Sequence, residues 1–193
     1  MRLVFATGNK HKLSEITQLV PPDFTILDLQ DIGCFEEIPE TAPTIPENAL
    51  QKARYVFSKY ACNCFADDTG LEVNALNGEP GVYSARYAGE EKSAEKNISK
   101  VLSELAVSAD RGARFRTVIA LIINGKELLF EGIVEGEILT ERRGTAGFGY
   151  DPIFKPAGFT KSFAEMSAAE KNACSHRAIA VNKLVDYLKT HIS

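Results

Sequence analysis

Apolar residues recur along the chain with two different periods, and these periods predict its first elements. Residues 2–6 predict a short strand, after which leucine, isoleucine and valine recur at helical spacing until the prolines at 21–22. Residues 24–29 predict a second strand, whereas the acidic, proline-containing residues 33–46 predict a loop. A second helix begins near Pro46, and its buried stripe consists of Ala49, Leu50, Ala53, Val56, Phe57 and Tyr60.

The second part of the chain predicts further strands and helices. The sequence CFADD, residues 64–68, predicts a strand with carboxylates at its end, and a helix is expected at about 92–105. Residues 117–123, TVIALII, form a continuous apolar run that is typical of a central strand covered on both faces. Asn124-Gly125 then predicts a tight hairpin into an antiparallel strand. The last helix carries Val181, Leu184, Val185 and Leu188 on one face.

The order of these elements indicates the fold class. Strands alternate with helices early and a hairpin follows, so we predict an α/β fold with a mixed central β-sheet and flanking helices. The 193 residues lie in the usual range for one domain, and no repeat, low-complexity stretch or linker interrupts them. We therefore predict a single domain over residues 1–193.

Composition narrows the possible partners. Apolar residues make up 45% and charged residues 25%, which is typical of a globular protein, and the net charge of −4 argues against nucleic acid as a partner. No apolar run approaches the ~20 residues that span a bilayer, so no membrane partner is expected. The four cysteines, without an export signal, predict reduced thiols and a cytoplasmic protein.

The sequence ATGNKHK lies where the first strand ends and a helix begins. Backbone N–H groups at a helix start are unpaired and the helix dipole makes that end positive, so phosphate binds there readily. Gly8 permits close approach, Thr7 and Asn9 supply short polar side chains, and Lys12 adds a positive charge. The alternative is an ordinary capped turn, because Thr and Asn are common helix caps. The lysine at an end that normally prefers anions favours phosphate.

Adjacent carboxylates in ADDTG are a candidate metal site. Neighbouring residues on a strand point to opposite faces, so one carboxylate can face a cleft while the other meets the scaffold. Glu40 is a second candidate, since Mg²⁺ prefers one or two carboxylates together with waters and phosphates. The alternatives are a simple turn after the strand and a solvated acidic loop around Glu40. Lys52, one turn after Asn48, is able to reach the same place, although most helix lysines are solvated.

Two segments near the C-terminus suggest a pocket for a flat ring: the glycine-rich segment GTAGFGYDP, residues 144–152, and the basic segment AEKNACSHR, residues 169–177. Phe148 is able to stack on a nucleobase, and Asp151 is able to accept hydrogen bonds from ring N–H groups. Lys171, His176 and Arg177 are donors, which favour a 6-oxo purine because the amine of adenine would leave a donor unmatched. The alternative for SHR is that Ser175 caps the final helix and the next two residues form its exposed first turn.

Five segments together resemble a known family. FATGNKHKLSEI, ETAPTIPENALQKA, ADDTGLEVNALNGEPGVYSARYAG, GTAGFGYDPIF and MSAAEKNACSHR occur in this order across nearly the whole chain. They closely resemble the noncanonical purine NTP pyrophosphatases, the inosine triphosphatase (HAM1-like) family. The resemblance implies two lobes around a deep cleft, a homodimer, and Mg²⁺-dependent cleavage of ITP, dITP and XTP to the monophosphate and pyrophosphate, which cleanses the nucleotide pool.

The resemblance also implies roles for individual residues. It assigns the metal to Glu40 and Asp68, with Asp68 also the proton acceptor. It assigns contact with the substrate to Thr69, where bacterial members often have serine, and contact with phosphate to Lys52. The triphosphate loop maps to Thr7, Gly8, Asn9, Lys10, His11 and Lys12, and the base pocket maps to Phe148, Gly149, Tyr150, Asp151, Lys171, His176 and Arg177.

Two other functions stay open at this point. A Maf-like pyrophosphatase of modified pyrimidine nucleotides shares a similar small-residue opening but not the pairing of FGYDP with SHR. A nucleotide sensor without catalysis would bind ITP and release no pyrophosphate, although such a protein has less need of the carboxylates.

Overall fold

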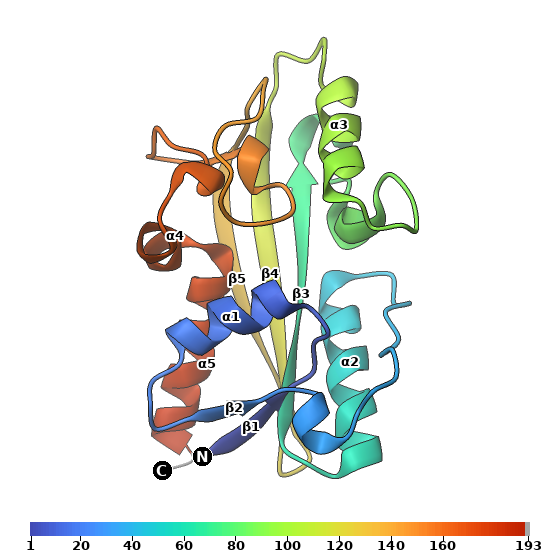
Figure 1. Ribbon diagram of the computed structural model, residues 1–193, viewed down its shortest axis with the longest axis vertical. Helices are drawn as coiled ribbons and strands as arrows, with labels where there is room; N and C mark the ends of the chain where they lie inside the picture. The colour runs from blue at the N-terminus through green and yellow to red at the C-terminus, as the bar shows by residue number, and fades with distance from the viewer. Residues whose placement is uncertain (192–193) are drawn as a thin grey trace. The chain divides into compact units, whose positions relative to one another are not determined.

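The computed structural model describes residues 1–191 and confirms an α/β fold with a mixed sheet and flanking helices (Figure 1). The described strands form one sheet of six in the order β2-β1-β3-β4-β5-β6. The strands are β1 (Arg2–Phe5), β2 (Thr25–Leu27), β3 (Cys64–Val73), β4 (Gly112–Ile123), β5 (Lys126–Ile138) and β6 (Phe154–Pro156). The helices are α1 (Lys10–Leu19), α2 (Ile45–Tyr60), α3 (Ala94–Glu104), α4 (Ala168–Cys174) and α5 (His176–His191).

Strand directions make the sheet mixed. β1 pairs in parallel with both β2 and β3, whereas β5 and β6 are antiparallel. Only Asn124 and Gly125 connect β4 to β5, and their φ angles are 50° and 78°. Positive φ at both central residues is what a type I′ hairpin turn needs. The hairpin predicted from the sequence is therefore confirmed.

The chain divides into two compact units, and β3, β4 and β5 contribute residues to both. Unit 1 consists of residues 1–68, 117–132 and 177–193. Unit 2 consists of residues 69–116 and 133–176. The single domain predicted from the sequence, with two lobes around a cleft, stays a prediction.

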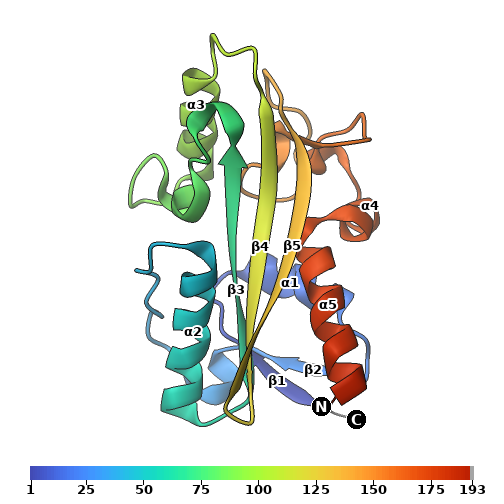
Figure 2. The same cartoon turned by 180° about the vertical axis from the view of Figure 1, so that it is seen from behind.

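In unit 1, helices cover the sheet on both faces (Figure 1 and, from behind, Figure 2). Phe5 and Phe65 stack with their ring centroids 4.7 Å apart, in a core that also contains Ile16 of α1 and Leu184 of α5. The opposite face packs against α2, where Sγ of Cys64 donates a hydrogen bond to the carbonyl oxygen of Ala53. The face of β3 that carries Phe65 therefore looks toward α1 and α5, and the face that carries Cys64 looks toward α2.

Unit 2 has its own hydrophobic core beneath α3 and the glycine-rich segment. Leu71 and Val73 of β3 pack there with Ile98 and Val101 of α3. Phe115 of β4 meets Phe154 edge to face, with ring centroids 4.7 Å apart, and Phe163 lies beside both. Each unit thus buries an apolar cluster of its own.

Most element boundaries agree with the sequence prediction, but β3 does not. The carboxylates were expected at the end of a strand, whereas β3 continues to Val73 and places Asp67 and Asp68 in its interior. Leu71 and Val73 keep the strand apolar beyond them, and cations on flanking helices neutralise the buried carboxylates. The simple turn after Asp68 is therefore wrong as an alternative.

Candidate functional site

The start of α1 is shaped by its cap. Asn9 is the N-cap residue, and its Oδ1 accepts hydrogen bonds from the backbone N–H groups of His11 and Lys12, at 2.9 and 3.2 Å. Thr7 in turn accepts from the backbone N–H of Asn9 at 3.2 Å. The capped turn considered from the sequence is thus present. Phosphate binding at this turn stays a prediction, and Gly8, Asn9, Lys10 and His11 are exposed there.

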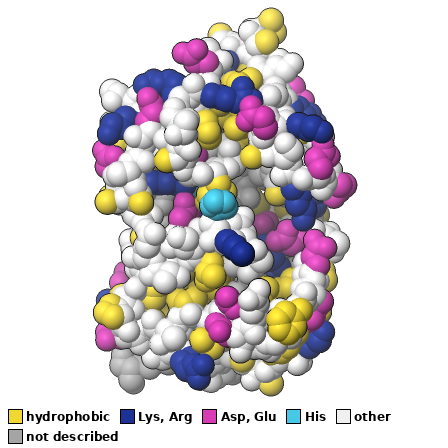
Figure 3. Space-filling view, in the orientation of Figure 1, with side chains coloured by type: hydrophobic (Ala, Val, Ile, Leu, Met, Phe, Trp, Pro, Cys, Tyr) yellow, Lys and Arg dark blue, Asp and Glu magenta, His cyan; other side chains and the backbone are white. Residues whose placement is uncertain are grey.

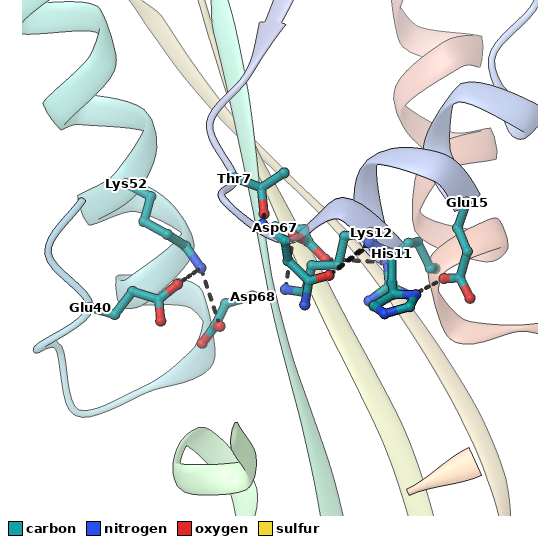
Figure 4. A network of polar contacts seen from close by, with 10 residues as sticks. Thr7, His11, Lys12, Glu15, Glu40, Lys52, Asp67 and Asp68 are labelled. Atoms are coloured by element: carbon teal, nitrogen blue, oxygen red, sulfur yellow. Dashed lines mark hydrogen bonds and ion pairs between the residues drawn. The ribbon is translucent and has the colours of Figure 1, made fainter. Parts of the chain in front are cut away.

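The two adjacent carboxylates of β3 point to opposite faces of the strand, as predicted (Figure 4). Asp67 shares the face of Phe65 and reaches Lys12 of α1. Asp68 shares the face of Cys64 and reaches Lys52 of α2. One residue step in the sequence therefore separates two different polar clusters.

The first cluster, on the α2 face, consists of Asp68, Glu40 and Lys52. Nζ of Lys52 lies 2.6 Å from Oε1 of Glu40 and 3.4 Å from Oδ1 of Asp68 (Figure 4). Lys52 is 4% exposed, so the solvated helix lysine considered from the sequence is wrong. The predicted metal ligands and the predicted phosphate-contacting lysine therefore meet in one place.

The loop that carries Glu40 is fixed to α2 by side-chain amides. Asn48, buried on α2, accepts from the backbone N–H of Ala42 at 2.8 Å. Gln51 accepts from the backbone N–H of Thr41 and donates to its hydroxyl, both at 2.9 Å. Buried side chains that satisfy backbone groups hold a loop in one conformation. The loop around Glu40 is thus held by α2, although the Glu40 side chain is 38% exposed and solvent still reaches it.

Asp68 has an unusual electrostatic environment. Burial raises its pKa, and the nearby Lys52 ammonium offsets this only in part. Its Oδ2 is buried and has no hydrogen-bond partner within the described part of the chain. Burial alone would lower the pKa of Lys52, but Asp68 and Glu40 raise it above its usual value, so this lysine stays charged. A buried carboxylate oxygen without a partner is costly and suits a cation or a proton.

The second cluster, on the opposite face, is built around Asp67. Nζ of Lys12 lies 3.0 Å from Oδ1 of Asp67, and Nε of Arg177 lies 3.3 Å from Oδ2. Arg177 also donates from Nη1 to Glu15 of α1. Although burial opposes it, Lys12 and Arg177 hold the pKa of Asp67 below its usual range. This cluster therefore joins β3 to α1 and α5 through charge.

Unit 2 brings together part of the predicted base pocket. Oδ2 of Asp151 accepts from Nζ of Lys171 at 2.7 Å and from the backbone N–H of Phe148 at 2.8 Å. Nζ of Lys171 also lies 5.1 Å from the ring centroid of Phe148. Gly147 has a φ of 75°, and a Cβ atom there would overlap the Asp151 carboxylate. The absence of a side chain at Gly147 thus allows the glycine-rich segment to close around Asp151.

The other predicted pocket residues have structural partners. Tyr150 is buried and donates from its hydroxyl to the carbonyl oxygen of Ser84 at 2.8 Å. His176 stacks on Phe115 with ring centroids 4.6 Å apart. His176 and Arg177 are 3% and 1% exposed, so an exposed first turn of α5 is wrong. Gly149 and Thr69 are half-buried, and their contact with a ligand stays a prediction.

The surface charge and the remaining side chains give no sign of a further metal site or a membrane span within residues 1–191. Basic and acidic side chains are interspersed on the face that Figure 3 shows. Within residues 1–191, three or more histidine, cysteine or acidic side chains do not gather as a metal cluster would need. Among the same residues, every helix is too short or too polar to cross a membrane.

Sequence reasoning found Glu40, Lys52 and Asp68 but missed the partners that hold them. The sequence predicts only that Asn48 lies one turn before Lys52, and it gives no signal for the roles of Gln51 and Glu15. Asp67 was recognised as the residue on the other face, without its cations. Those cations come from α1 and α5, which are far apart in sequence, so spacing alone gives no signal for them.

Comparison with known proteins places the chain in a family. The sequence model described as Ham1 family matches residues 3–187. The chain belongs to the Ham1 family. This confirms the family resemblance seen in the five ordered segments, and the Ham1 match includes the residues of both polar clusters.

Full-length relatives carry the name dITP/XTP pyrophosphatase. The one from Flavobacterium johnsoniae is 57% identical, over 97% of this chain and 98% of its own length. The one from Christiangramia forsetii is 59% identical, over 97% and 99%. Among solved structures, the Ham1 protein of Staphylococcus aureus is 39% identical, with a TM-score of 0.90 over 98% of this chain and 99% of its own. The fold of this Ham1 chain is therefore shared with solved family members.

Proposed function

We propose that this protein hydrolyses noncanonical purine nucleoside triphosphates, namely ITP, dITP and XTP, to the monophosphate and pyrophosphate. The observation that carries the proposal is the cluster of Glu40, Asp68 and Lys52, in which a buried carboxylate oxygen has no hydrogen-bond partner among residues 1–191. Membership in the Ham1 family and full-length relatives named dITP/XTP pyrophosphatase support it.

The residues at this cluster fit a magnesium ion. Two carboxylates from different segments converge, and Oδ2 of Asp68 is the kind of oxygen donor that hard cations prefer. Two protein ligands leave room for waters and phosphate oxygens, which Mg²⁺ keeps in nucleotide sites. We therefore assign Mg²⁺ to Glu40 and Asp68. When bound, it supplies Lewis-acid polarisation of phosphate oxygens and neutralisation of their charge.

The chain's own residues account for the proton and the charge. Water attacks the α-phosphorus, Asp68 accepts a proton from it, and the bond from the α-phosphorus to the bridging oxygen of the β-phosphate breaks. Lys12 and Lys52 stabilise the charge that develops on the departing pyrophosphate. No covalent intermediate is required, and Thr69 contacts the substrate without acting as nucleophile.

The base is assigned to Phe148, Asp151, Lys171 and His176, which all belong to unit 2. The ring of Phe148 offers a flat face, and Lys171 and His176 offer donors to a 6-oxo group. The carboxylate of Asp151 receives Lys171 and so fixes the direction of that donor. Adenine would place an amine against donors and leave a hydrogen bond unmade, at a cost of about 1–3 kcal/mol.

A pyrophosphate-release assay tests the proposal with ITP, XTP, dITP, ATP and dUTP, each with Mg²⁺ and with a chelator. The expected result is rapid release from the first three, slow release from the others, and none in chelator. Preference for dUTP would favour the pyrimidine-directed alternative instead. Tight ITP binding without release in Mg²⁺ would favour a sensor.

Two further properties complete the proposal. We expect a homodimer, which the family resemblance implies, and a cytoplasmic location, which the four cysteines without an export signal predict. Sedimentation of the full chain checks the first, and fractionation of source cells checks the second. A monomer at micromolar concentration would contradict the expected dimer without affecting the chemistry.

A further inference from the structure

Asp67 has no place in the proposed chemistry, yet it is the most enclosed carboxylate of the two polar clusters. Its side chain has no exposed surface, and it lies one residue before Asp68 on the other face of β3. One of its oxygens binds Lys12 and the other binds Arg177. A carboxylate in this position is shielded from a nucleotide by the cations that it holds.

Both cations depend on Asp67 for their charge and their place. Lys12 is 14% exposed at its side chain and Arg177 only 1%. Their charges repel each other, and burial disfavours both, so each needs a nearby anion. Glu15 provides one for Arg177, since it binds Nη1 of that residue. Asp67 contacts both cations, since it binds Nζ of Lys12 and Nε of Arg177.

The two cations belong to different parts of the proposed substrate. Lys12 is assigned to the triphosphate, at the start of α1, and Arg177 is assigned to the base, at the start of α5. Through one carboxylate, β3 therefore holds a phosphate-contacting group and a base-contacting group in fixed positions. Small displacements of positioning groups, on the order of 1 Å, cost about a hundredfold in rate in other enzymes.

We propose that Asp67 is a positioning residue, which holds Lys12 and Arg177 where they contact the nucleotide and touches neither the nucleotide nor a metal ion itself. The inference rests on the proposed function. It assigns the two neighbouring aspartates to separate tasks: Asp68 acts in the chemical step, and Asp67 acts in substrate binding through the two cations.

The test compares Asp67→Asn with Asp68→Asn and with Glu127→Gln as a matched control. Glu127 is an exposed carboxylate that binds Arg54, and neither residue of this ion pair belongs to the two polar clusters. Steady-state hydrolysis of ITP gives KM and kcat, and calorimetric titration with ITP in chelator gives Kd without turnover. For Asp67→Asn we expect KM and Kd to rise at least about tenfold, with a smaller change in kcat. The control should match the wild type.

A double substitution separates positioning from direct contact. If Asp67 acts through Lys12, then Asp67→Asn should weaken ITP binding less in a Lys12→Met background than in the wild type. Equal losses in the two backgrounds would overturn the inference. So would a Kd for the single Asp67→Asn variant that equals the wild-type value.

Other outcomes are also decisive. Should Asp67→Asn fail to fold, Glu15→Gln removes the second anion from Arg177 at a less buried position, and its KM should rise about threefold or more. A folded Glu15→Gln with unchanged KM would then count against the inference. A wild-type protein that releases no pyrophosphate from ITP would instead refute the proposed function, whereas the Kd measurements in chelator would still test the role of Asp67.

Discussion

Asp67 and Asp68 are the same residue type, one peptide apart, and the structure moves their pKa values in opposite directions. Both are buried, which raises the pKa of a carboxyl group. Lys12 and Arg177 overcome this at Asp67, whose pKa falls below its usual range, whereas Lys52 is insufficient at Asp68, whose pKa rises. The difference comes from the strand pleat, which gives each carboxylate its own set of neighbouring helices. Burial alone therefore does not tell a structural carboxylate from a reactive one.

The largest expected effect belongs to Asp68. Asp68→Asn keeps the shape of the side chain but removes the proton acceptor, so kcat for ITP should fall by about 10² to 10⁴-fold while ITP still binds. Pyrophosphate release and calorimetric binding measure the two quantities. A variant that turns over ITP at the wild-type rate would end the assignment of Asp68 as the base.

The free energy of unfolding should depend more on Asp67 than on Asp68, which is the reverse of the effect on kcat. Asp67→Asn leaves Lys12 and Arg177 buried without their shared anion, and breaking such a pair costs about 3–5 kcal/mol in the free energy of unfolding. Asp68→Asn should change the same quantity by about 1 kcal/mol or less, because its charged form is already disfavoured by burial. Urea denaturation of both variants measures the contrast, and equal losses would contradict it.

A substitution of Lys52 tests how the charge next to Asp68 affects Mg²⁺ binding. Its ammonium lies against both proposed metal ligands, and a unit charge about 4 Å away contributes on the order of several kcal/mol at a protein surface. Lys52→Met should therefore tighten Mg²⁺ binding to the nucleotide-free protein by about tenfold or more. Titration calorimetry with Mg²⁺ alone measures it. Lys59→Met, on the same helix but paired with the exposed Glu36, is the control and should leave Mg²⁺ binding unchanged.

The smallest expected effect is on acid stability. Because the pKa of Asp67 is lower in the folded protein than in the unfolded chain, its stabilisation is complete above the unfolded value of about 4 and is lost as pH falls below it. The raised pKa of Asp68 has the opposite sign, so its protonation relieves a cost as pH falls. Denaturation between pH 6 and about 2 should show a shallower acid loss for Asp67→Asn than for the wild type. A slope as steep as that of the wild type would count against the pairing.

The sequence determined the order of elements, the turn at Asn124-Gly125 and the segments that identify the family. These features depend on neighbouring residues: hydrophobic period, a two-residue turn and helix caps such as Asn9 are local properties of the chain. It also predicted that Asp67 and Asp68 point to opposite faces, because the strand period of two is fixed by backbone geometry. The roles of Glu40 and Lys52 are predicted from the family resemblance and from the chemistry of a carboxylate and an ammonium group.

Only the tertiary structure decided what each carboxylate meets. Lys12, Asp67 and Arg177 lie on three elements that are distant in sequence, and their contacts exist because α1 and α5 pack on the same face of the sheet. The anchoring of Glu40 through Asn48, and the interior position of Asp68 within a longer β3, likewise depend on packing. A charge in a buried strand is tolerated only where an opposite charge from another element reaches it, and spacing along the chain does not reveal that element.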